Sequence, residues 1–351
     1  MLSNRSAGSE STPTLCLLVP GMLSLVQTDA GGGLPVPRLK ALESLLARAD
    51  RSQRSVGVER QLFELFHVET DTNADLPVAA VTRVLDLGVI DKGWWLRADP
   101  VHLTPDRDRL ILAGPDRLAL RPEEAEQLAA EVIESYRADG WVLKAPRPDR
   151  WYLRPPTTPS ITTTPILEVE GRDIAPCLPK GPDGKAWHTV LNEIQILLHS
   201  SKVNEARERS GQLPVNSLWF WGGGILPRLP SQHWVHVWAD DPVALSLARL
   251  AEVPASPTAD SLDACLQECP AGDQLMVLDA ARAPARYGDG SEWTATFEHY
   301  ERDWFAPLLA ALREGRIAAA TLIDENGATF SVTTPQARRW WRWRRPLAVY
   351  C

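Results

Sequence analysis

The chain has 351 residues, of which 44% are hydrophobic and 23% are charged, and its formal net charge is -8. This is an ordinary globular composition, and a chain of this length can bury a large core without disulfides or metals. The negative balance argues against general affinity for nucleic acids or anionic membranes, so nucleic acid is not an expected partner. Five cysteines without a CxxC pair favour a reducing, cytoplasmic compartment.

The N-terminal part of the chain is predicted to pass from a disordered segment into a buried strand. Residues 1–13 are polar and contain no apolar run of signal-peptide length. The run TLCLLVP over Thr14–Pro20 is apolar, ends at a Pro-Gly turn and is too short to span a membrane. Leucines at helical spacing then predict a helix over Leu39–Asp50, with further helices near Val58–Phe66 and Val78–Leu87.

The middle of the chain, residues 91–215, mixes short strands and helices and predicts an inserted α+β subdomain. Pro122 followed by two glutamates is a typical helix start. The stretch Pro155–Gly184 is rich in Pro, Thr and Gly, which predicts mostly loop. Apolar residues on one side predict a helix over Ala186–Ser200.

The last third of the chain alternates strands with helices. A long helix is expected over Thr294–Arg313, and Asn326-Gly327 predicts a hairpin turn. Strands alternating with helices at both ends of the chain predict a doubly wound α/β sheet, formed by residues 14–90 and 216–351. Further strands are predicted over Asn216–Gly224, His233–Ala239 and Gln274–Ala280.

The stretch Lys202–Gly224 is the most distinctive of the sequence. A helix containing Asn and Arg precedes a turn with Gly, Pro and Asn, and then an apolar strand that ends in glycines. This stretch resembles a segment of the archaeal-type cofactor-independent phosphoglycerate mutases, which belong to the alkaline-phosphatase-like superfamily. Together with WLRADPVHLTPDRDRLIL and WADDPVALSLARLAEVP, it is also similar to the RpfE-type regulatory proteins of bacteria. The resemblance implies an alkaline-phosphatase-like sheet.

The chemistry of the resembled mutases requires two divalent metals, held by Asp and His, and a Ser that is phosphorylated. Two cations stabilise both the attacking and the leaving oxygen of the phosphoryl group. Where the family has a metal-binding Asp after the first strand, this chain has Pro20, and no His follows Asp279 until His299. The sequence therefore predicts no metal, no cofactor and no catalytic residue, and a non-catalytic relative with a regulatory or binding role.

The expected ligand of such a relative is a phosphorylated small molecule or a protein partner. Arginines bind phosphate bidentately, and a glycine run lets backbone N–H groups approach an anion. Solvated surface arginines and a tight turn explain the same residues without a ligand. The predicted ligand-binding residues are Asn204, Arg207, Asn216, Gly222, Gly223, Gly224, Arg150 and Arg154.

Two alternatives stay open. The first is an active metal-dependent mutase, and hence an isomerase, or a phosphatase, with a rearranged site built from Asp240, Asp241, His236 and Asp279, although helix capping is the favoured role of Asp240 and Asp241. The second is a nucleic-acid or membrane-surface adaptor that uses the five Arg and three Trp of Arg338–Arg345. We favour a tail that packs on its domain, with a compact cation–π cluster.

Overall fold

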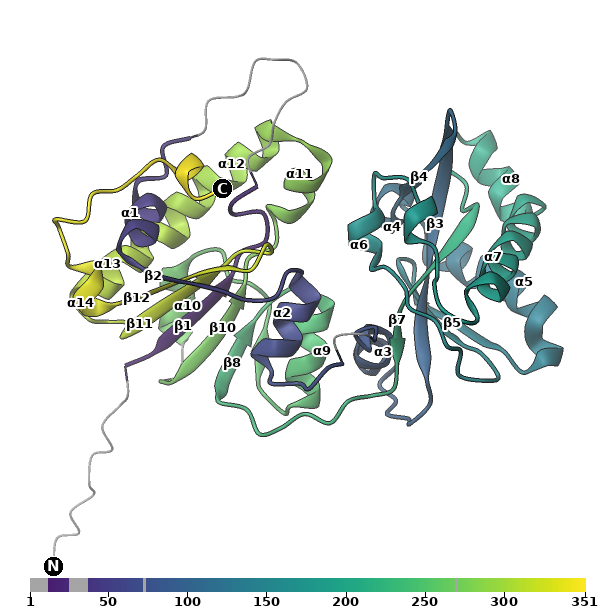
Figure 1. The fold of residues 1–351 in the computed structure, drawn as a ribbon, viewed down its shortest axis with the longest axis horizontal. Coiled ribbons are helices and arrows are strands. Elements are labelled where there is room, and N and C mark those ends of the chain that lie inside the picture. The colour runs from purple at the N-terminus through teal and green to yellow at the C-terminus, as the bar shows by residue number, and fades with distance from the viewer. Residues whose placement is uncertain (1–11, 25–36, 72–73, 269–270) are drawn as a thin grey trace, which may run out of the picture. The chain divides into compact units, whose positions relative to one another are not determined.

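The computed structural model describes residues 12–24, 37–71, 74–268 and 271–351, and the chain divides into two compact units. Unit 1 contains the described residues up to His67 together with Leu229–Cys351 (Figure 1). Unit 2 contains the described residues of Val68–Arg228. Most of the predicted disordered segment, residues 1–11, lies outside the described residues.

Unit 1 is built on one mixed sheet. Its described strands are β1 (Thr14–Leu18), β2 (Asp50–Gln53), β8 (Trp234–Trp238), β9 (Ala255–Ser256), β10 (Asp273–Val277), β11 (Ala319–Ile323) and β12 (Ala328–Thr333). Their order in the sheet is β2-β12-β11-β1-β10-β8-β9. β1 is parallel to both of its neighbours, and β8 and β9 continue in the same direction. β12 is antiparallel to β11 and to β2.

Helices cover both faces of this sheet (Figure 1). They are α1 (Lys40–Arg48), α2 (Val58–Leu65), α9 (Pro242–Leu250), α10 (Leu262–Glu268), α11 (Arg282–Tyr287), α12 (Gly290–Tyr300), α13 (Ala306–Glu314) and α14 (Thr334–Ala337). The core beneath α1, α10, α12 and α13 includes Leu15 and Leu17 of β1, while Cys16 and Leu18 are buried towards the other face. A central parallel strand is apolar on both faces. The predicted doubly wound α/β class is confirmed.

The long helix expected over Thr294–Arg313 is interrupted. A π-helical turn, η3 (Glu301–Phe305), separates α12 from α13. Pro307 supplies no N–H to the helical hydrogen-bond ladder, so the chain forms one wider turn before α13 continues. The predicted hairpin around Asn326-Gly327 is confirmed as the connection between β11 and β12.

Unit 2 combines an antiparallel sheet with helices. Its described strands are β3 (Trp95–Asp106), β4 (Arg109–Ala113), β5 (Val142–Arg147), β6 (Arg150–Arg154) and β7 (Ser217–Gly224). Its helices of four residues or more are α3 (Val78–Leu87), α4 (Pro115–Leu118), α5 (Pro122–Tyr136), α6 (Ile166–Val169), α7 (Gly184–His199) and α8 (Lys202–Arg209). The long β3 pairs with β4, β6 and β7, and β5 pairs with β6.

The boundaries between the units differ from the expected ones. We expected residues 14–90 and 216–351 in the core and residues 91–215 in the insert, but the division falls at 67/68 and 228/229. β7 pairs with β3, and α3 packs on both strands, so both elements belong to unit 2. An apolar run identifies a buried strand, but it does not identify the sheet that the strand joins.

Candidate functional site

Acidic residues gather where the parallel strands of unit 1 end, an edge that we call the carboxyl edge. Asp240 and Asp241 follow β8, Asp279 follows β10, and Asp324 follows β11. Pro20 lies at the corresponding end of β1. The ends of parallel strands meet at one side of a sheet, and open α/β sheets bind their ligands there. The carboxyl edge is therefore the candidate functional site.

An arginine, Arg282, lies among these carboxylates. Arg282 is the first residue of α11, three positions after Asp279, and its side chain is 13% exposed. Its Nη2 lies 2.9 Å from Oε1 of Glu59, and its Nη1 lies 3.9 Å from Oδ2 of Asp241. Its Nε is buried and has no hydrogen-bond partner among the described residues. The guanidinium thus supplies positive charge to the carboxyl edge.

Burial and this guanidinium together set the proton affinities at the edge. Burial raises the pKa of Asp241 to about 6, against the attraction of Arg282. Burial likewise raises the pKa of Asp279, and Arg282 again opposes the shift. Burial alone would raise the pKa of Glu59, but the Arg282 guanidinium holds it below its ordinary value. Glu59 is therefore the ionised partner of Arg282.

The loops at the carboxyl edge are held together by contacts within unit 1. Oδ1 of Asp324 accepts from the N–H of Leu23 at 3.0 Å, and its Oδ2 accepts from the N–H of Asn326 at 3.1 Å. Gly21 has a φ of +80°, and a Cβ there would lie 2.9 Å from the carbonyl oxygen of Ala281. The turn after β1 therefore packs directly on the loop that leads into α11.

The four residues of the alternative metal site do not form one ligand set. Asp241 caps α9, because its Oδ1 accepts from the N–H groups of Val243 and Ala244 at 2.9 Å each, which confirms its predicted capping role. Nε2 of His236 instead lies 3.0 Å from Oγ of Ser256.

The strand register explains why His236 and Asp279 are apart. His236 pairs with Gln274 of β10, and Asp279 lies five residues further along that strand and the loop after it. Five residues of extended chain span about 16 Å, so His236 does not reach the carboxyl edge.

The residues present do not fit the two-metal centre that the resemblance implies. Within the described residues, no group of three or more His, Cys, Asp or Glu is placed to hold a metal ion. Metal ligands must be acceptors, whereas Arg282 brings only donors and a positive charge to this edge. One oxygen of Asp241 is committed to its helix cap, and Pro20 has no side-chain oxygen.

The predicted ligand-binding residues all lie in unit 2, and two of them have buried side chains with internal partners. Nε of Arg207 donates to the carbonyl oxygen of Leu213 at 2.9 Å, and Nη1 lies 2.8 Å from Oε2 of Glu124. Asn204 donates to the carbonyl oxygen of Val215 at 2.7 Å and accepts from its N–H at 2.9 Å. These contacts join α8 to α5 and to the start of β7.

Asn216 and the glycine run serve close packing in unit 2. The Asn216 amide exchanges two hydrogen bonds with the backbone of Leu103, at 2.7 and 2.9 Å. A Cβ on Gly222 would lie 3.1 Å from Cβ of Val78, one on Gly223 would lie 2.4 Å from a ring carbon of Trp94, and one on Gly224 would lie 2.6 Å from Cβ of Pro77. The space beside these glycines is filled by protein.

The two remaining predicted ligand residues, on β6, are separate from Arg207. Arg150 forms a bidentate pair with Asp86 at 2.8 and 2.9 Å, and these contacts raise its pKa against the effect of burial. Arg154 is exposed, and its guanidinium carbon lies 5.4 Å from the ring centre of Trp95. The structure therefore places the eight residues within one unit but gives most of them internal contacts.

Arg282 was not among the sequence-predicted site residues. The segment DAAR (Asp279–Arg282) carries the signal, a basic residue one helical turn after the acid that ends a buried strand. Arg282 pairs with Glu59, more than 200 residues away in sequence, so the pair is visible only once the fold is known.

The sequence of the chain matches known proteins over short segments. It is 33% identical over 73 residues to the probable 2,3-bisphosphoglycerate-independent phosphoglycerate mutase of Geobacter sulfurreducens, covering 21% of this chain and 18% of that protein. It is 34% identical over 65 residues to the corresponding mutase of Methanosarcina mazei, covering 18% and 16%. The matched segments span less than a fifth of the curated relatives. No model of a known protein family matches the chain.

The chain is distantly similar to the cofactor-independent phosphoglycerate mutases. The PH0037 protein of Pyrococcus horikoshii shares its fold, with a TM-score of 0.52 at 11% identity, over 91% of this chain and 87% of that protein. The cofactor-independent phosphoglycerate mutase of Thermoplasma acidophilum aligns with a TM-score of 0.41 at 16% identity, over 92% and 90%.

Proposed function

We propose that this protein is a non-catalytic relative of the cofactor-independent phosphoglycerate mutases, with a regulatory or ligand-binding role like that of the RpfE-type proteins that it resembles. The observation that carries the proposal is the Arg282 guanidinium at the carboxyl edge, paired with Glu59 and facing Asp241. In the resembled family, metal cations supply the positive charge at this edge.

An arginine does not perform the chemistry of a metal pair. A divalent cation binds the phosphoryl oxygens and the nucleophile directly, and it lowers the pKa of a bound hydroxyl group. Arg282 can neutralise Glu59 and part of the charge of Asp241, which keeps the buried edge stable. It offers no open coordination position to a nucleophile, so the edge supports folding and binding and not phosphoryl transfer.

The test is the metal content and mutase activity of the purified full chain, with and without added manganese. We expect no bound metal above the background of a metal-free control protein, and no conversion of 3-phosphoglycerate. The Methanosarcina mazei mutase, assayed in the same buffers, serves as the positive control. About two metals per chain together with turnover of 3-phosphoglycerate would overturn the proposal.

The ligand class and the compartment are part of the same proposal. A phosphorylated small molecule or a protein partner is the proposed ligand, because the similarity is to mutases of a phosphorylated substrate. A reducing cytoplasm is the proposed location, and Cys16, Cys177 and Cys351 are free thiols. Among the helices of the described residues, none combines the length and the hydropathy of a membrane span.

A further inference from the structure

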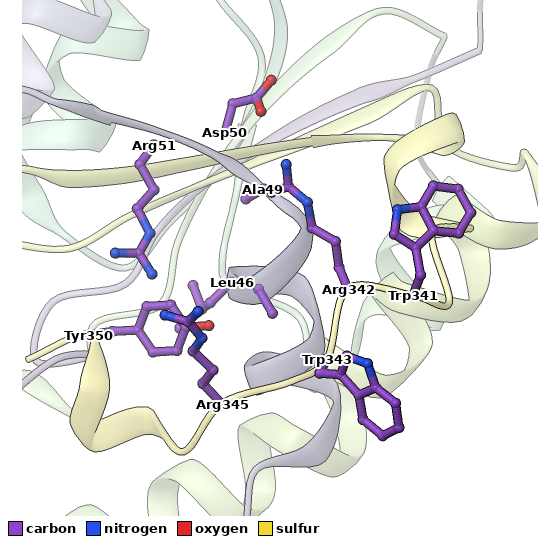
Figure 2. Close-up of a pocket in the computed structure, with 10 residues that line it drawn as sticks. Leu46, Ala49, Asp50, Arg51, Trp341, Arg342, Trp343, Arg345 and Tyr350 are labelled. Carbon is purple, nitrogen blue, oxygen red and sulfur yellow. The ribbon is translucent and has the colours of Figure 1, made fainter.

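A basic and aromatic cavity lies in unit 1, formed by α1, β2 and the C-terminal segment (Figure 2). We call it the tail pocket; its volume is about 690 Å³, which lies within the usual range for small-molecule sites. The side chains that characterise it are those of Arg51, Trp341, Arg342, Trp343, Arg345 and Tyr350.

The lining of the tail pocket is cationic. Within the described residues, Arg51, Arg342 and Arg345 take part in no ion pair with a carboxylate, although all three line the cavity. The one acidic lining residue is Asp50, and its Oδ2 already accepts from Nε2 of Gln336 at 2.7 Å. Three uncompensated guanidinium groups around one hollow favour an anion, because each can donate two parallel hydrogen bonds to phosphate oxygens.

Aromatic rings lie beside these cations with their faces accessible. Trp341 is 58% exposed and Trp343 is 86% exposed. Trp340 contacts Trp341 edge-on, with ring centres 6.0 Å apart, and is 80% exposed. The compact cation–π cluster expected within Arg338–Arg345 stays a prediction for these rings, most of whose surface is exposed to solvent. Exposed indoles beside arginines are typical of surfaces on which nucleobases stack.

The walls of the tail pocket are held in place from both sides. Nη1 of Arg48 donates to the carbonyl oxygen of Ala337 at 3.1 Å, which fixes the start of the segment. Leu347 is fully buried and Tyr350 is nearly so, and both belong to the main core of unit 1. The prediction that the tail packs on its domain is thus confirmed at its two ends, while the residues between them face solvent.

Tyr350 forms the floor of the tail pocket. The guanidinium carbon of Arg51 lies 4.5 Å from the ring centre of Tyr350. Figure 2 shows Arg51 and Arg345 approaching the Tyr350 ring from two sides, and Arg342 extending towards Ala49. The three guanidinium groups therefore belong to side chains that line one hollow. An anionic membrane surface would contact a flat or protruding face, so the concave arrangement favours a discrete ligand.

We propose that the tail pocket binds a nucleotide, with its phosphate on Arg342 and Arg345 and its base stacked on Trp341 or Trp343. Phosphate alone would leave the exposed indoles without a role, and an uncharged aromatic ligand would leave three arginines unpaired. The same recognition suits a free mononucleotide and one nucleotide unit of a single-stranded nucleic acid. Because the net charge of the chain is -8, we expect nucleotides to bind at this basic segment and not over the rest of the protein surface.

The experiment titrates the full chain with AMP, ADP and fluorescein-labelled single-stranded octanucleotides of DNA and RNA, and follows anisotropy and tryptophan fluorescence. We expect saturable binding with quenched tryptophan emission and an affinity that falls with salt. Arg342→Ala and Trp343→Ala should each weaken binding at least tenfold. The matched control is Arg302→Ala, an exposed arginine of the same unit that pairs with Asp303.

The arms of the experiment separate the outcomes. Equal affinity for AMP and for the oligonucleotides would indicate a mononucleotide site, and tighter binding of the oligonucleotides would indicate a single-strand site. Thermal melting of each variant checks that the fold is retained. The proposal is overturned if neither class binds or if Arg342→Ala behaves like Arg302→Ala. The mutase assay is independent of all these arms, so the two proposals can fail separately.

Discussion

At the scale of single residues, the feature that supports the proposed non-catalytic role is Arg282 among the carboxylates of the carboxyl edge. Pro20 in place of an acid was visible in the sequence, and so was the lack of a His between Asp279 and His299. The sequence did not show what compensates the remaining carboxylates. Arg282 supplies the compensating positive charge. It forms an ion pair with Glu59, a residue on α2 that only the folded chain brings near. Buried charges require paired partners, and such partners are set by tertiary structure.

The variant Arg282→Met tests this pairing. It leaves the buried Glu59 carboxyl without its ion-pair partner, so we expect the free energy of unfolding to fall by about 3–5 kcal/mol. Chemical denaturation at pH 7 measures it, and the exposed Arg302→Ala should change stability by less than about 1 kcal/mol. The double variant Glu59→Gln, Arg282→Met should recover part of the loss. A single variant as stable as the parent would show that the pair contributes little.

At the scale of elements, local sequence patterns predicted the individual elements better than they predicted which elements pack together. The apolar run of β1, the Asp241 cap of α9 and the Asn-Gly hairpin follow from short-range chemistry, and the structure confirms each. The glycine run Gly222–Gly224 is compatible in sequence with an anion site or with a tight turn, because a glycine pattern alone does not show what approaches the backbone. In the structure, protein side chains approach it.

Gly224→Ala tests the packing role of that run. A Cβ there would lie 2.6 Å from Cβ of Pro77, so β7 and the segment before α3 must separate. We expect a loss of about 1–3 kcal/mol in the free energy of unfolding, as for other overpacked sites. Gly211→Asn is the control, because nothing lies within 4 Å of its added Cβ and Asn tolerates its φ of +73°. Equal stability of the two variants would contradict the close packing at Gly224.

At the scale of the whole molecule, the net charge and the local distribution of charge predict different ligands. A net charge of -8 argues against general affinity for nucleic acids, and it hides a segment with five arginines at one end of the chain. The fold places that segment over α1 and β2 and leaves its indoles exposed. The class of fold was predictable because β–α alternation is a local property. The division into units was not, because strand partners are not encoded in a hydrophobic pattern.

The pH dependence of the stability of the whole protein should include a contribution from a carboxyl group at the carboxyl edge. Burial raises the pKa of Asp324 from 3.8 to about 6, so the native state binds this proton more tightly than the unfolded state does. The contribution of Asp324 to stability is therefore fully present below about pH 3.8 and is lost as the pH rises through 6. Between pH 4.5 and 7 this loss amounts to about 2 kcal/mol.

Denaturant titrations of the parent and of Asp324→Asn at both pH values measure this contribution as a difference. The variant cannot ionise, so its free energy of unfolding should fall by about 2 kcal/mol less than that of the parent over the same interval. Asp260→Asn, an exposed control, should follow the parent profile. Groups whose pKa is lowered by folding, such as Glu59, act in the opposite direction, but they act equally in both proteins and cancel in the comparison. Parallel profiles for parent and Asp324→Asn would show that this carboxyl titrates normally and that the edge is more open to water than its burial indicates.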